Sequence, residues 1–421
     1  MLEKVKKQEV SNGVKKLLLI VMDGLGEKPL SVLGDKTPLG KANTPNLDHL
    51  AKEGICGEIS PFWFPSQGYP RSDTAHLGLF GYDPHEYYLN RGPYEATGIG
   101  VELKEGDIAL RANFGTVDED LKVVDRRAGR ISETESLVKS LSEIKDIEGV
   151  EFLITKSWGH RAILVMRGDN LSSKIEDPDP HKIGLKVGDV KASEKEAEFT
   201  SHVLTEYLKK AHEILKNHPL NKKRKEDGEL VANYLLLRGA GEMEKTPSFK
   251  ERYGLNSACI AGGALYKGIA RIVGMDLINV EGADGSANTN IKGKFQKAKE
   301  ILNNEGEFKD KEYNFIFLHI KATDCLAEDG DYEGKKNFIE RIDKEITPLF
   351  ELQNSLIAIT ADHCTCCDLK RHCVGEVPLL ISGDGKDSVE NFSEKACEEG
   401  GIGRIESLNF MKKFIELSKK I

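Results

Sequence analysis

The chain has 421 residues, of which 39% are hydrophobic and 31% are charged. A charged fraction above the roughly 25% of an average globular protein, in a chain longer than one core usually supports, predicts a water-soluble protein with one large domain and an insert, or with two domains. The net charge of -9 arises from 60 basic and 69 acidic residues mixed along the chain, which argues against a nucleic-acid partner or a membrane surface and leaves a small-molecule substrate.

The first apolar run, Leu17–Met22, follows a polar and charged start at Met1–Lys16. The run is far shorter than the roughly 20 residues of a membrane span, and the start does not have the pattern of a signal peptide. We therefore expect a cytoplasmic protein. The run itself is predicted to be a buried strand, and Asp23 follows it directly.

The segment Pro70–Gly78 has the pattern of a loop that enters a short helix ending near Gly81, with Ser72 at the helix start. The helix dipole and the unpaired N–H groups at such a position favour a bound phosphate or a serine alkoxide. Ser72 is therefore a candidate nucleophile. The alternative is that its hydroxyl only caps the helix.

Residues 98–231 differ in pattern from the rest of the chain, because shorter predicted strands and a long polar helix replace the long apolar runs. We interpret this stretch as an inserted smaller α+β domain, within a core formed by residues 1–97 and 232–421. Its expected elements are strands at Ile108–Phe114, Glu151–Ile154 and Ala162–Met166, a helix at Glu194–Asn217 and a charged loop at Asn221–Glu229.

Further apolar runs belong to the predicted core. They alternate with stretches of helical spacing such as Lys335–Ile346, a pattern typical of a mostly parallel sheet that helices cover on both faces. The fold class is therefore α/β. The runs are Tyr234–Leu237, Phe315–Ile320, Leu356–Thr360 and Val377–Ser382.

Three of the apolar runs lead into acidic residues. Asp23 follows the first, Asp324 comes shortly after the run that ends at Ile320, and Asp362 follows the run that starts at Leu356. Alone, each acid would be read as a helix cap or a turn residue. Because ligands bind at the carboxyl edge of such sheets, we expect the three carboxylates to converge.

Converging carboxylates repel one another unless a cation lies between them. Asp together with His363, which follows Asp362, is a ligand set suited to manganese, zinc or iron rather than calcium. His372 lies close enough in sequence to return as a further ligand. Metal ions would lower the pKa of the Ser72 hydroxyl, and two ions about 3.5–4 Å apart could hold both the attacking and the phosphoryl oxygens.

The chain contains eight cysteines and starts without a secretion signal, so we expect free thiols or metal ligands rather than disulfides. Four of them surround His372, namely Cys364, Cys366, Cys367 and Cys373. Their spacing lacks the two C-x-x-C pairs of a structural zinc site. We predict that they are small loop residues.

Several motifs occur in order along nearly the whole chain: VMDGLGEKP (21–29), TPNLDHLAKEG (44–54), RSDTAHLGLFGYDP (71–84), RANFGTVD (111–118), DRRAGR (125–130), GHR (159–161), YKGIARIVGM (266–275), HIKATD (319–324) and TADH (360–363). Together they resemble the alkaline phosphatase superfamily and, within it, the archaeal-type cofactor-independent phosphoglycerate mutases. The resemblance implies an alkaline-phosphatase-like core.

The resemblance also implies two metal positions. One would be held by Asp23, Ser72, Asp362 and His363, and the other by Asp324, Glu328 and His372. The family pattern is D-x-x-x-H, so Glu328 stands where a histidine is expected. A carboxylate favours harder ions, and we expect two divalent ions with Mn²⁺ ahead of Mg²⁺, Co²⁺ or Zn²⁺. The alternative is that Glu328 is a bystander and the second position is weak.

The implied reaction is the interconversion of 2- and 3-phosphoglycerate in glycolysis and gluconeogenesis, through a phosphoserine at Ser72 and without bisphosphoglycerate. The phosphate and carboxylate of this substrate need cationic partners. One of Arg126 and Arg127 is expected to form a surface ion pair instead. The candidate substrate-binding residues are Arg111, Arg126, Arg130, His160 and Arg161 in the insert and Lys267 in the core.

The insert is also expected to act as a lid, because water that reached the phosphoserine would turn the mutase into a phosphatase. Two alternatives stay open. One is a metal-dependent phosphomonoester hydrolase of the same superfamily, and the other is a non-catalytic metal-binding relative. The sequence leaves the oligomeric state open.

Overall fold

The computed structural model describes residues 15–419, which fold into two compact units. The first unit comprises residues 15–88 and 247–419, and the second comprises residues 89–246. The insert predicted at 98–231 therefore lies inside a unit that is longer at both ends. Within the described range, no helix combines the length and the apolar character needed to cross a membrane. The start of the chain, for which no signal peptide is expected, lies outside the described residues.

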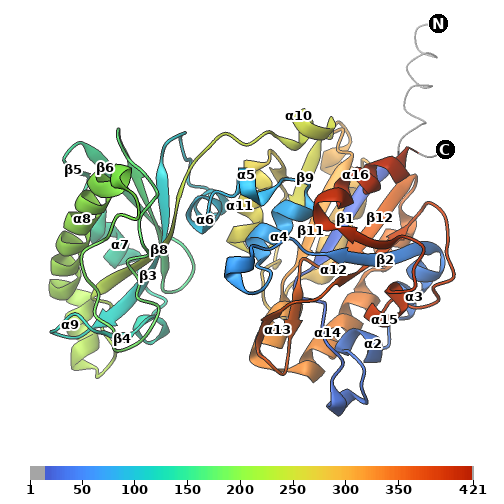
Figure 1. Ribbon diagram of the computed structural model, residues 1–421, viewed down its shortest axis with the longest axis horizontal. Coiled ribbons are helices and arrows are strands. Elements are labelled where there is room, and N and C mark those ends of the chain that lie inside the picture. Colours follow the sequence, from blue (N-terminus) through green and yellow to red (C-terminus); the bar gives the residue numbers. More distant parts are fainter. Residues whose placement is uncertain (1–14, 420–421) are drawn as a thin grey trace, which may run out of the picture. The chain divides into compact units, whose positions relative to one another are not determined.

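An eight-stranded, mostly parallel sheet forms the centre of the first unit (Figure 1). Strand β1 lies in the middle, and its residues from Leu17 to Met22 are at most 1% exposed. Burial on both faces explains why these strands are unbroken apolar runs. In spatial order the strands are β10 (Asp276–Leu277), β9 (Ser257–Ile260), β11 (Phe315–Ile320), β1 (Lys16–Met22), β12 (Ser355–Thr360), β15 (Val377–Ser382), β2 (Gly54–Ser60) and β16 (Gly403–Glu406).

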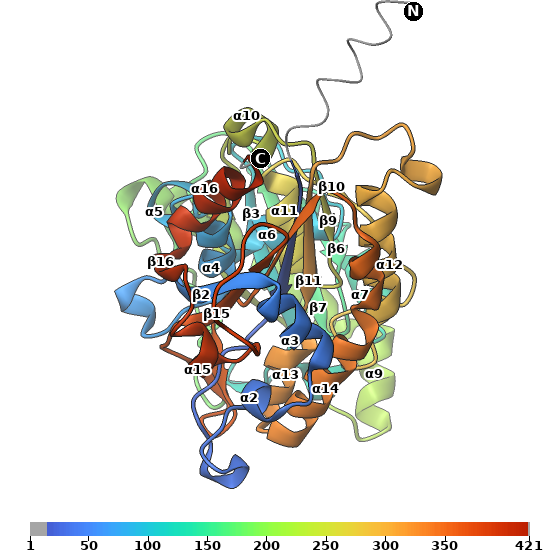
Figure 2. The same ribbon diagram turned by 90° about the vertical axis from the view of Figure 1, so that its right-hand side faces the viewer.

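The five neighbouring strands β10, β9, β11, β1 and β12 run parallel to one another, and β15 is antiparallel to both β12 and β2. Helices cover both faces: α4, α11 and α16 lie on one side, and α3, α12 and α14 on the other (Figure 2). The predicted α/β class is thus confirmed. The helices of this unit are α2 (Pro38–Lys41), α3 (Pro45–Lys52), α4 (Ser72–Leu79), α5 (Pro84–Tyr87), α10 (Phe249–Tyr253), α11 (Ala264–Ile272), α12 (Ile291–Leu302), α13 (Ala322–Asp329), α14 (Tyr332–Glu345), α15 (Glu394–Cys397) and α16 (Ser407–Ser418).

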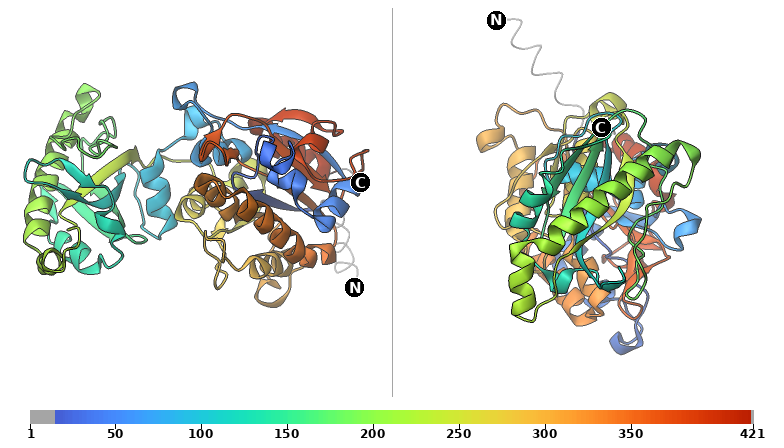
Figure 3. Two further views of the ribbon diagram at one scale, coloured as in Figure 1. Left: turned by 90° about the horizontal axis from the view of Figure 1, so that it is seen from below. Right: turned by 90° about the vertical axis from the view of Figure 1, so that its left-hand side faces the viewer.

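The second unit is built on an antiparallel sheet, and the long helix α8 lies across one face of it (Figure 3). Strand β3 is buried over its whole length: it pairs with β7 on one side and with β8 on the other, and α6 packs against it. The strands are β3 (Ile108–Val117), β4 (Val123–Asp125), β5 (Asp146–Ile147), β6 (Val150–Lys156), β7 (Arg161–Arg167) and β8 (Tyr234–Glu242). The helices are α6 (Arg91–Gly98), α7 (Glu135–Leu141), α8 (Glu198–Asn217) and α9 (Pro219–Glu226).

Two sequence-based expectations for this region were wrong. The run at Tyr234–Leu237 is a strand, but it pairs with β3 of the second unit rather than with the core sheet, because an apolar run does not specify its partner. The charged stretch at Asn221–Glu229 is mostly helical. Pro219 begins α9, the side chain of His218 accepts a hydrogen bond from the backbone of Leu220, and the amide of Asn221 is buried.

Candidate active site

The carboxyl ends of β11, β1 and β12 bring the predicted acids together. Strand β1 lies between the other two in parallel register, so Asp23, Asp324 and Asp362 emerge at the same edge of the sheet. Each of the three is at most 1% exposed. The convergence predicted from the strand ends is therefore present in the structure.

The first cluster of possible metal ligands comprises Asp23, Asp362 and His363. Nε2 of His363 lies 3.5 Å from Oδ1 of Asp23 and 3.2 Å from Oδ2 of Asp362. The hydroxyl oxygen of Ser72 lies 3.1 Å from the same Nε2. Ser72 is the first residue of α4, so the N-cap position belongs to Arg71 and the Ser72 hydroxyl contacts His363 instead. This geometry favours the nucleophile over the helix cap.

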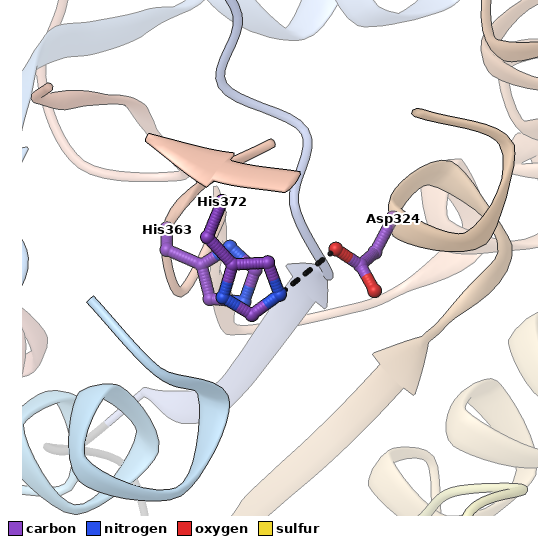
Figure 4. Close-up of side chains that lie close together, drawn as sticks. All are labelled: Asp324, His363 and His372. Atoms are coloured by element: carbon purple, nitrogen blue, oxygen red, sulfur yellow. Dashed lines mark ion pairs between the residues drawn. The ribbon is translucent and has the colours of Figure 1, made fainter. Parts of the chain in front are cut away.

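The second cluster comprises Asp324, His363 and His372 (Figure 4). Nε2 of His372 lies 3.4 Å from Oδ1 of Asp324. The two imidazole rings stack with their centroids 3.8 Å apart, so His363 belongs to both clusters. Glu328 is in neither cluster: its side chain is 52% exposed, and Oε1 lies 3.9 Å from Nε2 of His372.

The buried carboxylates fit a cation. Oδ1 of Asp23 and Oδ2 of Asp362 have no hydrogen-bond partner, although both residues are buried. Burial, together with the charge of Asp23, raises the pKa of Asp362. Unpaired buried carboxylate oxygens are costly unless a cation lies between them. Together with the imidazole nitrogen of His363, these oxygens form a donor set suited to a divalent transition metal.

The two histidines differ in protonation. Burial lowers the pKa of His363 to about 3, so its ring is neutral and able to ligate a metal. Burial also disfavours the charged form of His372, but the hydrogen bond and charge of Asp324 outweigh this effect and raise the pKa of His372 to about 9. Without a metal, His372 is therefore protonated at neutral pH.

A group of cationic residues lies in the second unit. Arg111 is 7% exposed, and its Nη1 lies 3.2 Å from Oε1 of Glu95. The Nε atoms of Arg111 and Arg161 are buried without a hydrogen-bond partner. Burial and the charge of Arg161 lower the pKa of His160 to about 4. Arg238 also acts electrostatically on Arg111. The three arginines share the carboxylate of Glu95 as a counter-charge, and such a group of cations is suited to binding an anionic ligand.

The sequence and the fold both resemble known enzymes. The family profile described as 2,3-bisphosphoglycerate-independent phosphoglycerate mutase matches residues 51–221. A relative from Archaeoglobus fulgidus, named 2,3-bisphosphoglycerate-independent phosphoglycerate mutase 1, is 46% identical over 95% of this chain and 97% of its own length. A relative of the same name from Methanocaldococcus jannaschii is 42% identical over 96% of this chain and 97% of its own length.

The chain belongs to this family of mutases. Among solved structures, the cofactor-independent phosphoglycerate mutase of Thermoplasma acidophilum matches with a TM-score of 0.71 and 35% identity, over 96% of this chain and 100% of its own. A protein of Pyrococcus horikoshii matches with a TM-score of 0.81 and 34% identity, over 97% and 99%. The resemblance found in the motifs is thereby confirmed.

The remaining candidate substrate-binding residues of this mutase family member differ in environment. Arg126 forms a two-point ion pair with the buried Asp179. Arg130 is exposed and lines a separate hollow of about 530 Å³ that also contacts Lys223. Lys267 lies in α11 of the first unit, where it is half-buried.

Sequence reasoning missed several residues that contact the ligand clusters. The ammonium group of Lys321 lies 3.2 Å from Oδ2 of Asp23 and also contacts Asp324. Nε2 of His319 lies 3.1 Å from Oδ2 of Asp23. Nδ1 of His76 lies 2.7 Å from the carbonyl oxygen of Ser72, to which it donates. All three lie inside motifs that carry the family resemblance, and those motifs were the sequence feature from which their importance could have been predicted.

Two expectations for the cysteines were wrong: one pair forms a disulfide, and Cys364, Cys366 and Cys373 lie in short strands rather than in loops. Cys366 and Cys373 form a disulfide that joins β13 (Cys364–Cys366) to β14 (Arg371–Cys373). The antiparallel pairing of these two short strands brings the thiols together, with 5.9 Å between the Cα atoms. The other six cysteines are free. None of the thiol groups is needed to complete the clusters around His363.

Proposed function

We propose that this chain interconverts 2- and 3-phosphoglycerate through a phosphoserine at Ser72, with two divalent metal ions and without bisphosphoglycerate. One observation carries the proposal: the Ser72 hydroxyl lies 3.1 Å from Nε2 of His363, the residue common to both ligand clusters. The names of the curated relatives support the same reaction. The serine is buried at the start of a helix, which suits a group that receives a phosphoryl anion.

In this proposal Asp23, Asp362 and His363 hold one ion beside Ser72, and Asp324 and His372 hold the other. When bound, two such ions lower the pKa of a nearby hydroxyl and neutralise the charge of the phosphoryl oxygens. The unpaired oxygens of Asp23 and Asp362 support this assignment.

Glu328 is proposed as a further ligand of the second ion. Its Oε1 atom lies 3.9 Å from Nε2 of His372, so Glu328 is the nearby carboxylate that would complete the ligand set of that ion. A carboxylate at this position makes Mn²⁺ the expected ion ahead of Zn²⁺.

The reaction then has two transfers. The oxygen of Ser72 attacks phosphorus and the bond to the substrate oxygen breaks, which leaves phosphoserine and glycerate. The glycerate turns, and its other hydroxyl takes the phosphoryl group back while the bond to Ser72 breaks. Lys321 supplies a positive charge beside Asp23 and Asp324 that can contact the phosphoryl oxygens.

The second unit is proposed to bind the anionic substrate through Arg111, His160 and Arg161. The buried, unpartnered Nε atoms of the two arginines support this role. A role as a lid follows from the chemistry, because phosphoserine must be kept from water if glycerate is to receive the phosphoryl group.

The test is to measure interconversion of the two phosphoglycerates with added Mn²⁺ and no bisphosphoglycerate, alongside the release of inorganic phosphate. We expect rapid interconversion with little phosphate release, and loss of both in Ser72→Ala. Release of phosphate without interconversion would instead identify a hydrolase. Bound Mn²⁺ without any turnover would identify a non-catalytic relative.

A further inference from the structure

Thr365 contacts residues of the two ligand clusters. It is a completely buried residue of β13. Its hydroxyl oxygen is 2.6 Å from Oδ1 of Asp324 and 3.2 Å from Nδ1 of His363. One hydroxyl therefore contacts a residue of the second cluster and the residue that both clusters share.

The direction of these hydrogen bonds follows from their partners. Nδ1 of His363 also lies 3.3 Å from the carbonyl oxygen of Cys364, which can only accept, so Nδ1 carries the ring proton. The hydroxyl of Thr365 accepts from Nδ1 and donates to the carboxylate of Asp324. The lone pair of His363 is then on Nε2, the atom nearest to Ser72 and Asp362.

Hydrogen bonds to neighbouring elements fix the backbone of Thr365. Its N–H donates to the carbonyl oxygen of Gly26 over 2.9 Å, and its carbonyl oxygen accepts from the ammonium group of Lys335 over 3.0 Å. Lys335 is completely buried and lies 3.4 Å from Oε2 of Glu27, which also accepts from the backbone of Cys367. A buried ion pair thus joins the loop after β1 to α14, and its lysine also binds the backbone of β13.

Gly24 makes room for this arrangement. A Cβ atom at this position would lie 2.4 Å from the hydroxyl oxygen of Thr365 and 2.8 Å from Cβ of Asp324. The φ angle of Gly24 is +61°, which other residues rarely adopt. The backbone next to Asp23 therefore permits the close approach of Thr365 and Asp324.

We infer that Thr365 is a positioning residue that couples the two metal positions, by fixing the tautomer of His363 and the orientation of the Asp324 carboxylate. This inference rests on the two-metal centre of the proposed function. Partners that orient metal ligands typically change metal affinity 10- to 100-fold when they are removed.

The test compares Thr365→Val, which removes the hydroxyl at nearly constant volume, with Thr365→Ser, which retains it. Calorimetric titration of the metal-free proteins with Mn²⁺ measures each binding step, and electron paramagnetic resonance measures coupling between the two ions. We expect Thr365→Val to bind the second Mn²⁺ about 10- to 100-fold more weakly and to lose the coupled spectrum. Thr365→Ser should restore both.

A measurement on the wild-type protein removes any dependence on how the variants fold. Nitrogen-15 NMR of the metal-free protein at neutral pH should place the ring proton of His363 on Nδ1. A proton on Nε2, or a Thr365→Val protein that binds both ions as the wild type does, would overturn the inference. If the wild type binds no Mn²⁺ at all, both the proposed function and this inference fail. Intact two-ion binding in Thr365→Val would remove only the role of Thr365.

Discussion

His372 is a candidate ligand whose protonation opposes metal binding. Although burial opposes it, Asp324 raises the pKa of His372 to about 9, and an incoming ion must displace the proton. The affinity for the second Mn²⁺ should therefore rise with pH from 6.5 to 8.5, about tenfold per unit for the release of one proton. Titration calorimetry at three pH values measures this slope.

The matched variant for this prediction is His372→Asn, which keeps a polar side chain without a titrating group in this range. Its affinity for the second ion should be weak and nearly independent of pH. A wild-type affinity that is flat over the same interval would show that His372 is not a ligand or is not protonated in the metal-free protein.

Glu328 is the residue at which this chain departs from the family pattern. We expect Glu328→Ala to lose much of the bound second ion, and Glu328→His to retain two ions with a shifted preference toward Zn²⁺, because imidazole is a softer ligand than carboxylate. Metal analysis of the purified proteins measures both. An unchanged two-ion content in Glu328→Ala would remove Glu328 from the ligand set.

At the scale of elements, the disulfide closes the β13–β14 hairpin that carries His372. Reduction should lower the free energy of unfolding of the first unit by about 2 kcal/mol, the value expected for a short loop. Denaturant unfolding with and without dithiothreitol measures the change. The double variant Cys366→Ser, Cys373→Ser should have the lower stability and should not respond to dithiothreitol; a wild type equally stable in both conditions would contradict this.

The strand ends were predictable because a central parallel strand is buried on both faces and so appears as an unbroken apolar run, as at Leu17–Met22. The position of Asp23 at the end of a strand could be predicted from that pattern. The sheet to which β8 belongs could not be predicted, because strand pairing depends on contacts between residues that are far apart in the sequence. The disulfide was missed for the same reason: Cys366 and Cys373 meet only through the register of their hairpin.

The supporting residues of the site were harder to predict than the proposed ligands. Carboxylates and histidines that occur together at strand ends usually indicate a metal site. A lysine such as Lys321 or a threonine such as Thr365 has many other roles in proteins, so its presence indicates no particular site. Their contacts with Asp23 and Asp324 exist only after β1, β11 and β13 have been brought together. The motif at 319–324 marks Lys321 without giving its function, and Thr365 lies outside the motifs.

At the scale of the whole molecule, the two units should contribute separate functions. Arg161→Ala in the second unit should raise KM for phosphoglycerate strongly and leave Mn²⁺ binding unchanged, because the metal ligands belong to the first unit. Lys209→Ala, which removes a well-exposed cation of the second unit, is the matched control and should leave KM unchanged. Kinetics and Mn²⁺ titration on the same preparations distinguish the two effects. Loss of Mn²⁺ binding in Arg161→Ala would contradict this division.

The central claim is that Ser72 carries the phosphoryl group during turnover. Its most direct test is rapid acid quenching of the Mn²⁺-loaded protein during turnover of ³²P-labelled 2-phosphoglycerate, followed by mapping of the labelled peptide. We predict label on the peptide that contains Ser72 and none in Ser72→Ala, which should also lose interconversion. Full interconversion by Ser72→Ala, or turnover that never labels Ser72, would contradict the account.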